Sequence, residues 1–115
     1  MSKLQVAQID QIADGQMKMV MAGDKEILLA RVAGSVFATQ NRCPHLDGNL
    51  SHGTLNGTVV TCPRHHSQYD VRDGRVLRWT SWPAAVLFFA KLLRSPRPLE
   101  TYPVTIEAGN IFVDA

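Results

Sequence analysis

The chain has 115 residues, which fits one domain, and apolar residues make up 45% of it, enough for a single core. Charged residues make up 19% and the net charge is only +2, which excludes a disordered chain and gives no indication of a nucleic-acid binder. The N-terminal MSKLQVAQID lacks the pattern of a signal peptide, and no apolar run approaches the ~20 residues of a membrane span. We therefore expect a soluble cytoplasmic protein.

Short turn sequences recur between apolar or β-branched runs along the chain, as they do between the strands of hairpins. The first hairpin predicted in this way joins EILLARV to SVFATQ around Gly34. The turn sequences are AGDKE at 22–26, AGS at 33–35, NG at 56–57, DG at 73–74 and AGN at 108–110. This pattern predicts a small all-β protein built from antiparallel hairpins.

The C-terminal region predicts a second clear hairpin. In TYPVTIE, residues 101–107, the side chains of Tyr102, Val104 and Ile106 fall on one face of a single strand. NIFVD, residues 110–114, then pairs back across Gly109.

The segment SWPAAVLFFAKLLRSPRP, residues 81–98, does not alternate and predicts a helical insert near 82–94. Ser81 can cap such a helix, and the prolines at 96 and 98 end it. Its apolar faces need cover, by packing on the β-core, by a docked partner or by a membrane surface. The flanking Trp79 and Trp82 and the basic residues Lys91, Arg94 and Arg97 suit an interfacial membrane helix, the third of these alternatives.

Positive charge gathers in one part of the chain. Seven basic residues lie between Arg64 and Arg97, and only Asp70 and Asp73 oppose them. This segment is either a solvated basic face or a docking surface for an acidic partner or an anionic membrane.

Two short pairs of cysteine and histidine are the candidate site: C-P-H at Cys43 and His45, and C-P-R-H at Cys62 and His65. The two cysteines could form a disulfide, but their histidine neighbours indicate a metal in a cytosolic chain. Two thiolates and two imidazoles can complete the tetrahedral coordination of zinc, although structural zinc sites usually pair a cysteine with a cysteine and a histidine with a histidine. Mixed pairs suit a centre in which each loop supplies one ligand to each of two metals.

The segment 43–74 closely resembles the Rieske iron–sulfur motif, C-x-H followed by C-x-x-H, and the resemblance extends to Gly53, Gly57, Asp70 and Gly74. Residues 27–45 and 99–113 resemble the first strands and the closing hairpin of bacterial Rieske ferredoxins. The resemblance implies one Rieske domain over 1–115, an antiparallel sandwich or barrel of hairpins with a cluster-binding subdomain at about 41–75 and the insert at about 79–98. It also implies that Cys43 and Cys62 hold one iron of a [2Fe–2S] cluster, and His45 and His65 the other.

This resemblance implies a one-electron carrier with no catalytic residue of its own. Its partners would be a flavoprotein reductase upstream and a terminal oxygenase or another redox enzyme downstream. Two alternatives are a small Rieske subunit of a larger complex, nitrite-reductase-like or respiratory, and a zinc-stabilised binding module.

Residues around the ligands imply how the cluster would be tuned. High-potential members of the family carry a second cysteine pair that bridges the two ligand loops. Leu46 and Arg64 stand at those two positions here, so this bridge is not expected. Pro63 lies inside the second ligand motif, and Ser67 and Tyr69 match hydroxyls that donate hydrogen bonds to cluster or ligand sulfur and raise the potential.

His66 stands where the family most often has glycine, at a position that permits positive φ. Histidine tolerates that region better than most residues, so we expect the loop to persist with an added imidazole at the cluster mouth. Together with Arg64, Trp79 and Trp82, His66 is a candidate docking residue; the alternative is a solvent-facing histidine without a role.

Overall fold

The computed structural model describes residues 3–43, 48–63, 66–78 and 98–115. Within these residues the chain forms strands and two single 3₁₀ turns, with no α-helix. The predicted helix near 82–94 lies outside the described residues. No helix in the described part of the chain is long and apolar enough to cross a membrane.

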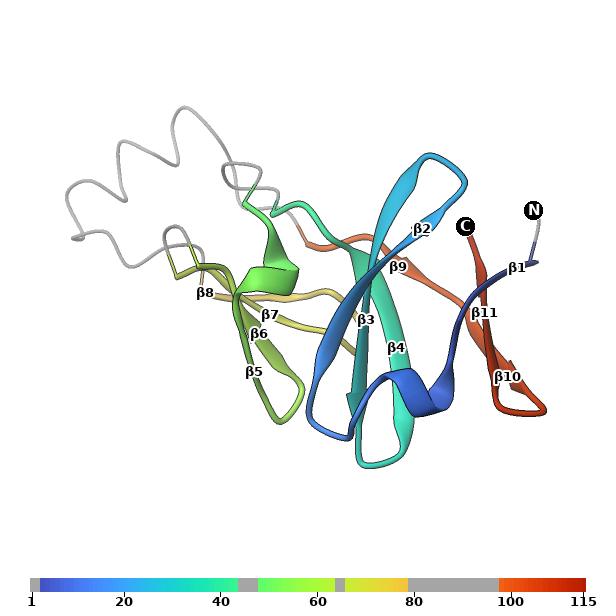
Figure 1. The fold of residues 1–115 in the computed structure, drawn as a ribbon. Helices are drawn as coiled ribbons and strands as arrows, with labels where there is room; N and C mark the ends of the chain where they lie inside the picture. Colours follow the sequence, from blue (N-terminus) through green and yellow to red (C-terminus); the bar gives the residue numbers. More distant parts are fainter. Residues whose placement is uncertain (1–2, 44–47, 64–65, 79–97) are drawn as a thin grey trace, which may run out of the picture.

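Three antiparallel sheets make up the fold (Figure 1). The first, in the order β1-β11-β10, contains β1 (Lys3–Gln8), β11 (Asn110–Asp114) and β10 (Val104–Glu107). The second, in the order β2-β3-β4-β9, contains β2 (Met17–Ala22), β3 (Lys25–Val32), β4 (Ser35–Gln40) and β9 (Thr101–Tyr102). The third, in the order β5-β6-β7-β8, contains β5 (Thr54–Asn56), β6 (Val59–Thr61), β7 (Gln68–Asp70) and β8 (Val76–Arg78). The 3₁₀ turns are η1 (Ile9–Gln11) and η2 (Leu50–His52).

All five predicted turn sequences lie between paired strands. The register runs Ala22↔Lys25, Val32↔Ser35, Asn56↔Val59 and Glu107↔Asn110 across four of them, and Tyr69↔Val76 across the fifth. A glycine with positive φ lies in each turn, which explains why each of these turn sequences contains glycine. The prediction of an all-β protein of antiparallel hairpins is therefore confirmed.

The predicted continuous strand over 101–107 is wrong, because Pro103 divides it. Before the proline, β9 pairs with β4, through Ala38↔Tyr102 and Thr39↔Thr101. After it, β10 pairs with β11 in a different sheet. Proline has no N–H to donate to a ladder, so the chain changes partners at this residue. The alternation of Tyr102, Val104 and Ile106 consequently spans two sheets, and Ile106 is 43% exposed.

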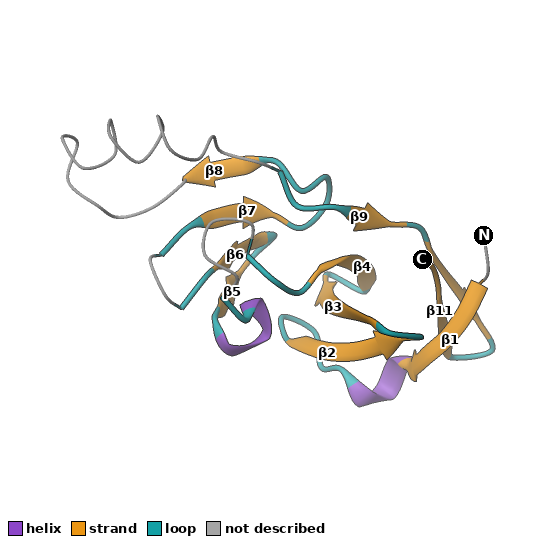
Figure 2. Ribbon diagram, turned by 90° about the horizontal axis from the view of Figure 1, so that it is seen from above, coloured by secondary structure: helices purple, strands orange, loops and turns teal. Residues whose placement is uncertain are grey.

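The second sheet lies between two apolar cores, which explains the unbroken apolar run of β3. Ile27 and Leu29 point into a core shared with the first sheet, together with Ile111 and Val113. Leu28 and Ala30 point into a second core shared with the third sheet. A strand buried on both faces cannot alternate with polar residues. Figure 2 shows the third sheet packed on one side of β3 and β4, and the pair β1 and β11 on the other.

Candidate metal centre

Cys43 lies three residues after the end of β4 and begins the first predicted ligand loop. Its backbone N–H donates to the carbonyl of Gly48 over 2.7 Å, which draws the two arms of the loop together. The side chain belongs to the second core and is only 2% exposed. The fold therefore presents this sulfur from a turn at the edge of an apolar core.

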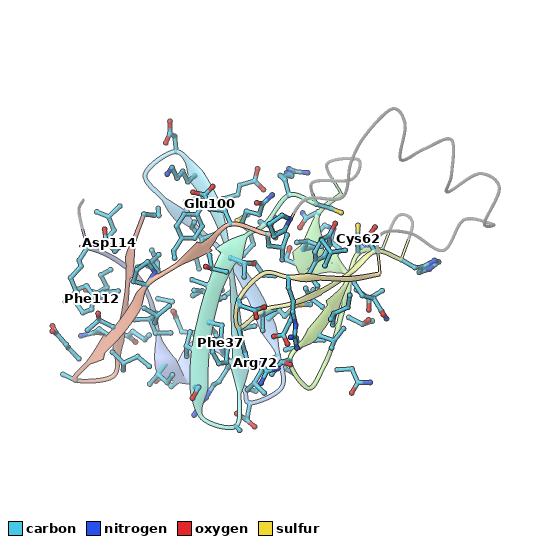
Figure 3. The ribbon with its side chains drawn as sticks, turned by 180° about the vertical axis from the view of Figure 1, so that it is seen from behind. Phe37, Cys62, Arg72, Glu100, Phe112 and Asp114 are labelled. Carbon is cyan, nitrogen blue, oxygen red and sulfur yellow. The ribbon has the colours of Figure 1, made fainter. Side chains whose placement is uncertain are left out.

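Cys62 directly follows β6 and has the same degree of burial. Its N–H donates to the carbonyl of Ser67 over 2.8 Å, and its own carbonyl accepts the N–H of His66 over 3.1 Å. Figure 3 shows Cys62 at the opposite end of the molecule from Phe112 and Asp114. The two cysteines share one core and neither forms a disulfide, so the disulfide alternative is not realised.

His66 has a φ of 61° and is exposed. The loop thus needs the left-handed conformation at this position, as predicted, and a histidine adopts it. The backbone bond from His66 to Cys62 closes the turn that contains the second ligand motif.

Tyr69 lies on β7 and connects the two predicted tuning hydroxyls to a candidate ligand. Its hydroxyl is 3.2 Å from Cys43 Sγ, and it also shares a side-chain hydrogen bond with Ser67. Ser67 and Tyr69 are both fully buried. Burial, followed by the hydrogen bond with Cys43, raises the pKa of Tyr69 well above its usual range. The phenol therefore stays protonated and can donate to a sulfur ligand.

Half of the predicted ligand set lies within the described residues. His45 and His65 fall outside them, as do Leu46, Arg64, Trp79 and Trp82. Pro63 is described and exposed, next to Cys62. What the structure brings together is the two cysteines, one from each motif, with Ser67 and Tyr69 beside them. Two buried sulfurs, one facing a phenol donor, fit the thiolate half of a mixed-ligand metal centre.

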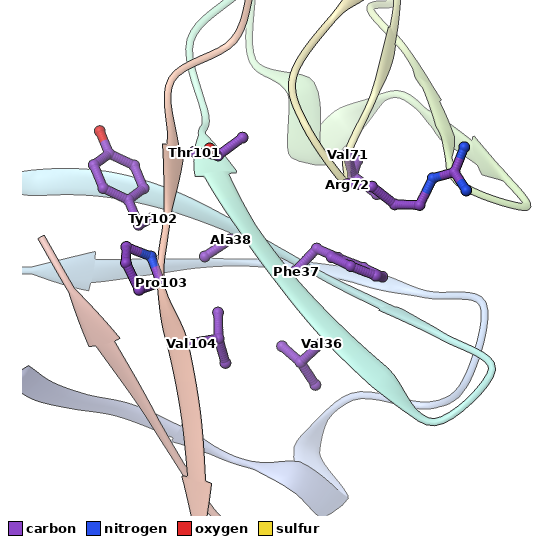
Figure 4. A pocket seen from close by; sticks show the side chains of 9 residues that line it. All are labelled: Val36, Phe37, Ala38, Val71, Arg72, Thr101, Tyr102, Pro103 and Val104. Carbon is purple, nitrogen blue, oxygen red and sulfur yellow. The ribbon is translucent and has the colours of Figure 1, made fainter.

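Asp70, the residue after Tyr69, anchors the turn between β7 and β8. Its carboxylate is 2% exposed and accepts hydrogen bonds from Arg72 Nη2 over 2.7 Å, from the Arg72 N–H over 2.9 Å and from Arg75 Nη2 over 3.4 Å. The hydrogen bond from Arg72 lowers the pKa of Asp70 to about 2. This turn lies against the second sheet, where Val71 and Arg72 line a hollow of about 420 Å³ with Phe37 and Tyr102 (Figure 4).

We expect Asp70→Asn to lower the free energy of unfolding by ~1–3 kcal/mol at pH 7. One carboxylate oxygen is replaced by an NH₂ group, which can only donate and would face the N–H groups of Arg72 and Arg75. The pKa of Asp70 is about 2 in the fold, below its ordinary value of 3.8, so this stabilisation is complete above pH 4 and is lost as pH falls through about 2. Urea unfolding at pH 7 and pH 3 checks this, and the difference from the wild type should shrink at pH 3. Asp73→Asn removes the same charge from a 58% exposed carboxylate and should have little effect.

A comparison with known protein families decides between the alternatives left by the sequence. The model of the Rieske [2Fe-2S] domain matches residues 2–103. The chain belongs to the Rieske [2Fe–2S] family. This excludes the zinc-stabilised module, and the family's cofactor is an iron–sulfur cluster in which two histidines replace two cysteines on one iron.

Individual Rieske proteins are similar over nearly the whole chain. The ferredoxin component of biphenyl 2,3-dioxygenase from Rhodococcus jostii is 35% identical over 103 residues, which are 90% of this chain and 83% of the relative. A solved ferredoxin from Sphingomonas yanoikuyae B1 is 30% identical, with a TM-score of 0.79 and 99% of both chains covered. A chain in the complex of reduced oxygenase and oxidized ferredoxin in carbazole 1,9a-dioxygenase is 25% identical, with a TM-score of 0.77, covering 96% of this chain and 91% of that one.

Two polar groups of the fold were not predicted from the sequence. One is the pairing of Asp70 with Arg72 and Arg75, for which the only signal was an acidic residue shortly before two basic ones. The other is a polar network around Asn41, two residues before the first ligand motif. A polar residue between a strand and a ligand motif was the available signal, but its burial became visible only in the fold.

Proposed function

We propose that this chain is the ferredoxin of a ring-hydroxylating oxygenase system, a one-electron carrier between a flavoprotein reductase and a terminal oxygenase. The observation that carries this proposal is the match to a dioxygenase ferredoxin component over 90% of this chain and 83% of that relative. The solved complex of an oxygenase with its ferredoxin supports the oxygenase as the acceptor. In this role the chain moves electrons and performs no chemistry on a substrate.

Within the centre we assign Cys43 and Cys62 to one iron, and His45 and His65 to the other. The anionic thiolates stabilise their iron in the oxidised state, whereas the neutral imidazoles let the other iron accept the electron. Burial of both cysteines supports this assignment, because a thiolate iron would then lie on the protein side of the cluster. His66 is exposed and follows His65 in the sequence; with Arg64, Trp79 and Trp82 it is proposed to contact the partner.

Electron paramagnetic resonance of the purified protein tests this function. The dithionite-reduced chain should give the signal of a mixed-ligand two-iron cluster, with two irons and two sulfides per chain. Reduction by a flavoprotein reductase with NADH, followed by reoxidation by a terminal oxygenase, tests the carrier role. A colourless protein with stoichiometric zinc would contradict the proposal, and so would a cluster that no oxygenase reoxidises.

We expect the double variant Ser67→Ala, Tyr69→Phe to have a lower reduction potential than the wild type. Each hydroxyl that donates toward sulfur stabilises the more negative reduced cluster, so its loss disfavours reduction. A decrease of about 60 mV corresponds to a tenfold change in a one-electron equilibrium constant. Protein-film voltammetry measures it, and Tyr102→Phe, which removes a phenol outside the second core, serves as the control. An unchanged potential in the double variant would refute the tuning role.

A further inference from the structure

Asn41 is a buried polar residue at the start of the first ligand loop, and its side chain forms three hydrogen bonds. It follows β4 directly and is 0% exposed. Its Nδ2 donates to Glu26 Oε1 over 3.1 Å and to Asn49 Oδ1 over 3.0 Å. Its Oδ1 accepts the backbone N–H of Ser51 over 3.1 Å. The amide therefore uses both of its donor hydrogens and its acceptor in the interior of the protein.

These bonds join the two arms of the loop that contains Cys43. The outgoing arm is 41–43 and the returning arm is 48–51, and the carbonyl of Asn41 also accepts the N–H of Leu50 over 2.9 Å. Arg42 forms a β-bridge with Asn49, and Cys43 donates to Gly48. The base of the loop is thus closed by backbone bonds, and Asn41 contributes the side-chain bonds that cross it.

Glu26 connects this closed loop to the rigid second sheet. It lies on β3 and binds Asn41 through Oε1 and Arg42 Nε through Oε2, the latter over 3.2 Å. The hydrogen bonds from Asn41 and Arg42 lower the pKa of Glu26, so its carboxylate is an acceptor at neutral pH. Two consecutive residues of the loop base are therefore held by one side chain of the sheet.

We propose that Asn41 is a positioning residue for the iron–sulfur cluster, holding Cys43 and the base of the first ligand loop against β3 through its bonds to Glu26, Asn49 and Ser51. This inference rests on the proposed function, because Cys43 must be a cluster ligand. Asparagine is required here because aspartate, of the same shape, would direct oxygens at the acceptors of Glu26 and Asn49. The carboxylate of Glu26 has no hydrogen to donate, and Asn49 Oδ1 is held as an acceptor by the N–H and the hydroxyl of Ser51.

The test uses the variant Asn41→Asp and its rescue by a second substitution, Glu26→Gln. In the double variant the new amide at position 26 donates to the new carboxylate at position 41, and the oxygen of that amide accepts from Arg42. The hydrogen bonds of position 26 therefore return, with donor and acceptor exchanged between positions 26 and 41, whereas the contact between position 41 and Asn49 Oδ1 stays unmade as in the single variant. The double variant also has the net charge of the wild type, which separates geometry from charge. We expect Asn41→Asp to lose its cluster roughly tenfold faster than the wild type, as a buried polar contact left unmade would cause.

Cluster geometry is read by the visible circular dichroism, by the paramagnetic resonance of the reduced protein and by the reduction potential. We expect Asn41→Asp to change all three and the double variant to restore them in part, because the bonds of position 26 return and the bond to Asn49 does not. Asn56→Asp adds the same charge at an exposed turn whose sequence remains compatible as Asp-Gly, so it should leave all three unchanged.

Unchanged spectra, potential and rate of cluster loss in Asn41→Asp would overturn the proposal, as would a double variant no better than the single one. If Asn41→Asp does not fold, Glu26→Ala removes the acceptors of Asn41 Nδ2 and Arg42 Nε at a partly exposed site and should alter the spectra in the same way but less. Unchanged spectra in that variant would also overturn the proposal. A wild-type protein without a two-iron signal would contradict the proposed function itself, which keeps the two failures distinct.

Discussion

His65→Ala is expected to abolish the iron–sulfur cluster, whereas His66→Gly is expected to keep it. The cluster needs four protein ligands, and the spacing C-x-x-H gives that role to His65. The backbone N–H at position 66 donates to Cys62 and persists in a glycine variant. Because φ at this residue is 61°, glycine also takes the conformation without the steric cost of a side chain. The turn that presents Cys62 should therefore remain intact in His66→Gly.

Iron and sulfide content, together with the visible absorption spectrum, measures this prediction. Cys43→Ser and Cys62→Ser should behave like His65→Ala, since each removes a ligand of the proposed set. A His66→Gly protein with less than half of the wild-type iron, beside a His65→Gly protein that retains its cluster, would reverse the assignment of the two adjacent histidines. His66→Gly should also show a stability close to that of the wild type, because relief of strain is offset by the greater freedom of an unfolded glycine.

Gly53→Ala is expected to produce the second largest effect, by separating the two ligand loops. A Cβ at this position would overlap the carbonyl oxygen of Thr61 and would lie 3.2 Å from that of Leu50. The φ of Gly53 is −84°, which any residue adopts, so glycine is needed for space and not for conformation. Thr61 directly precedes Cys62, and the backbone that must move therefore carries a ligand. We expect a loss of about 3 kcal/mol in the free energy of unfolding, at the upper end for overpacking.

Gly57→Ala is the matched control for this substitution. Gly57 has a φ of 61° but nothing lies within 4 Å of a Cβ built there. Its replacement should cost only the ~1–2 kcal/mol of a left-handed backbone and should leave the cluster content unchanged. Urea unfolding and iron content measured on both variants separate the two causes. Equal iron content in Gly53→Ala and Gly57→Ala would show that the close approach at Gly53 is not needed to hold the loops together.

Much of this protein could be predicted from local sequence because its turns are encoded locally. Positive φ and the small turn residues at Gly23, Gly34, Gly57 and Gly109 mark hairpins without reference to the rest of the chain. The candidate ligand motifs are similarly local, because only two residues separate Cys62 from His65 in the sequence. The resemblance to the Rieske motif also drew attention to the hydroxyl of Tyr69, which the fold places 3.2 Å from Cys43 Sγ.

The errors and omissions arose where distant segments meet. The division of residues 101–107 at Pro103 depends on which sheet edge is available on either side, and local alternation contains no information on that choice. The burial of Asn41 and its bond to Glu26 likewise depend on the packing of the first ligand loop against β3.

The sequence by itself determined the all-β class, the hairpin turns, the candidate ligand pattern and the need for positive φ at His66, since each rests on residues a few positions apart. Only the tertiary structure decided that β3 is buried on both faces, that Gly53 touches the backbone before Cys62, that Asn41 anchors the first ligand loop, and that Asp70 anchors the turn between β7 and β8. The physical reason is that burial and hydrogen-bond partners depend on which segments pack together, and this packing is decided by the whole chain at once.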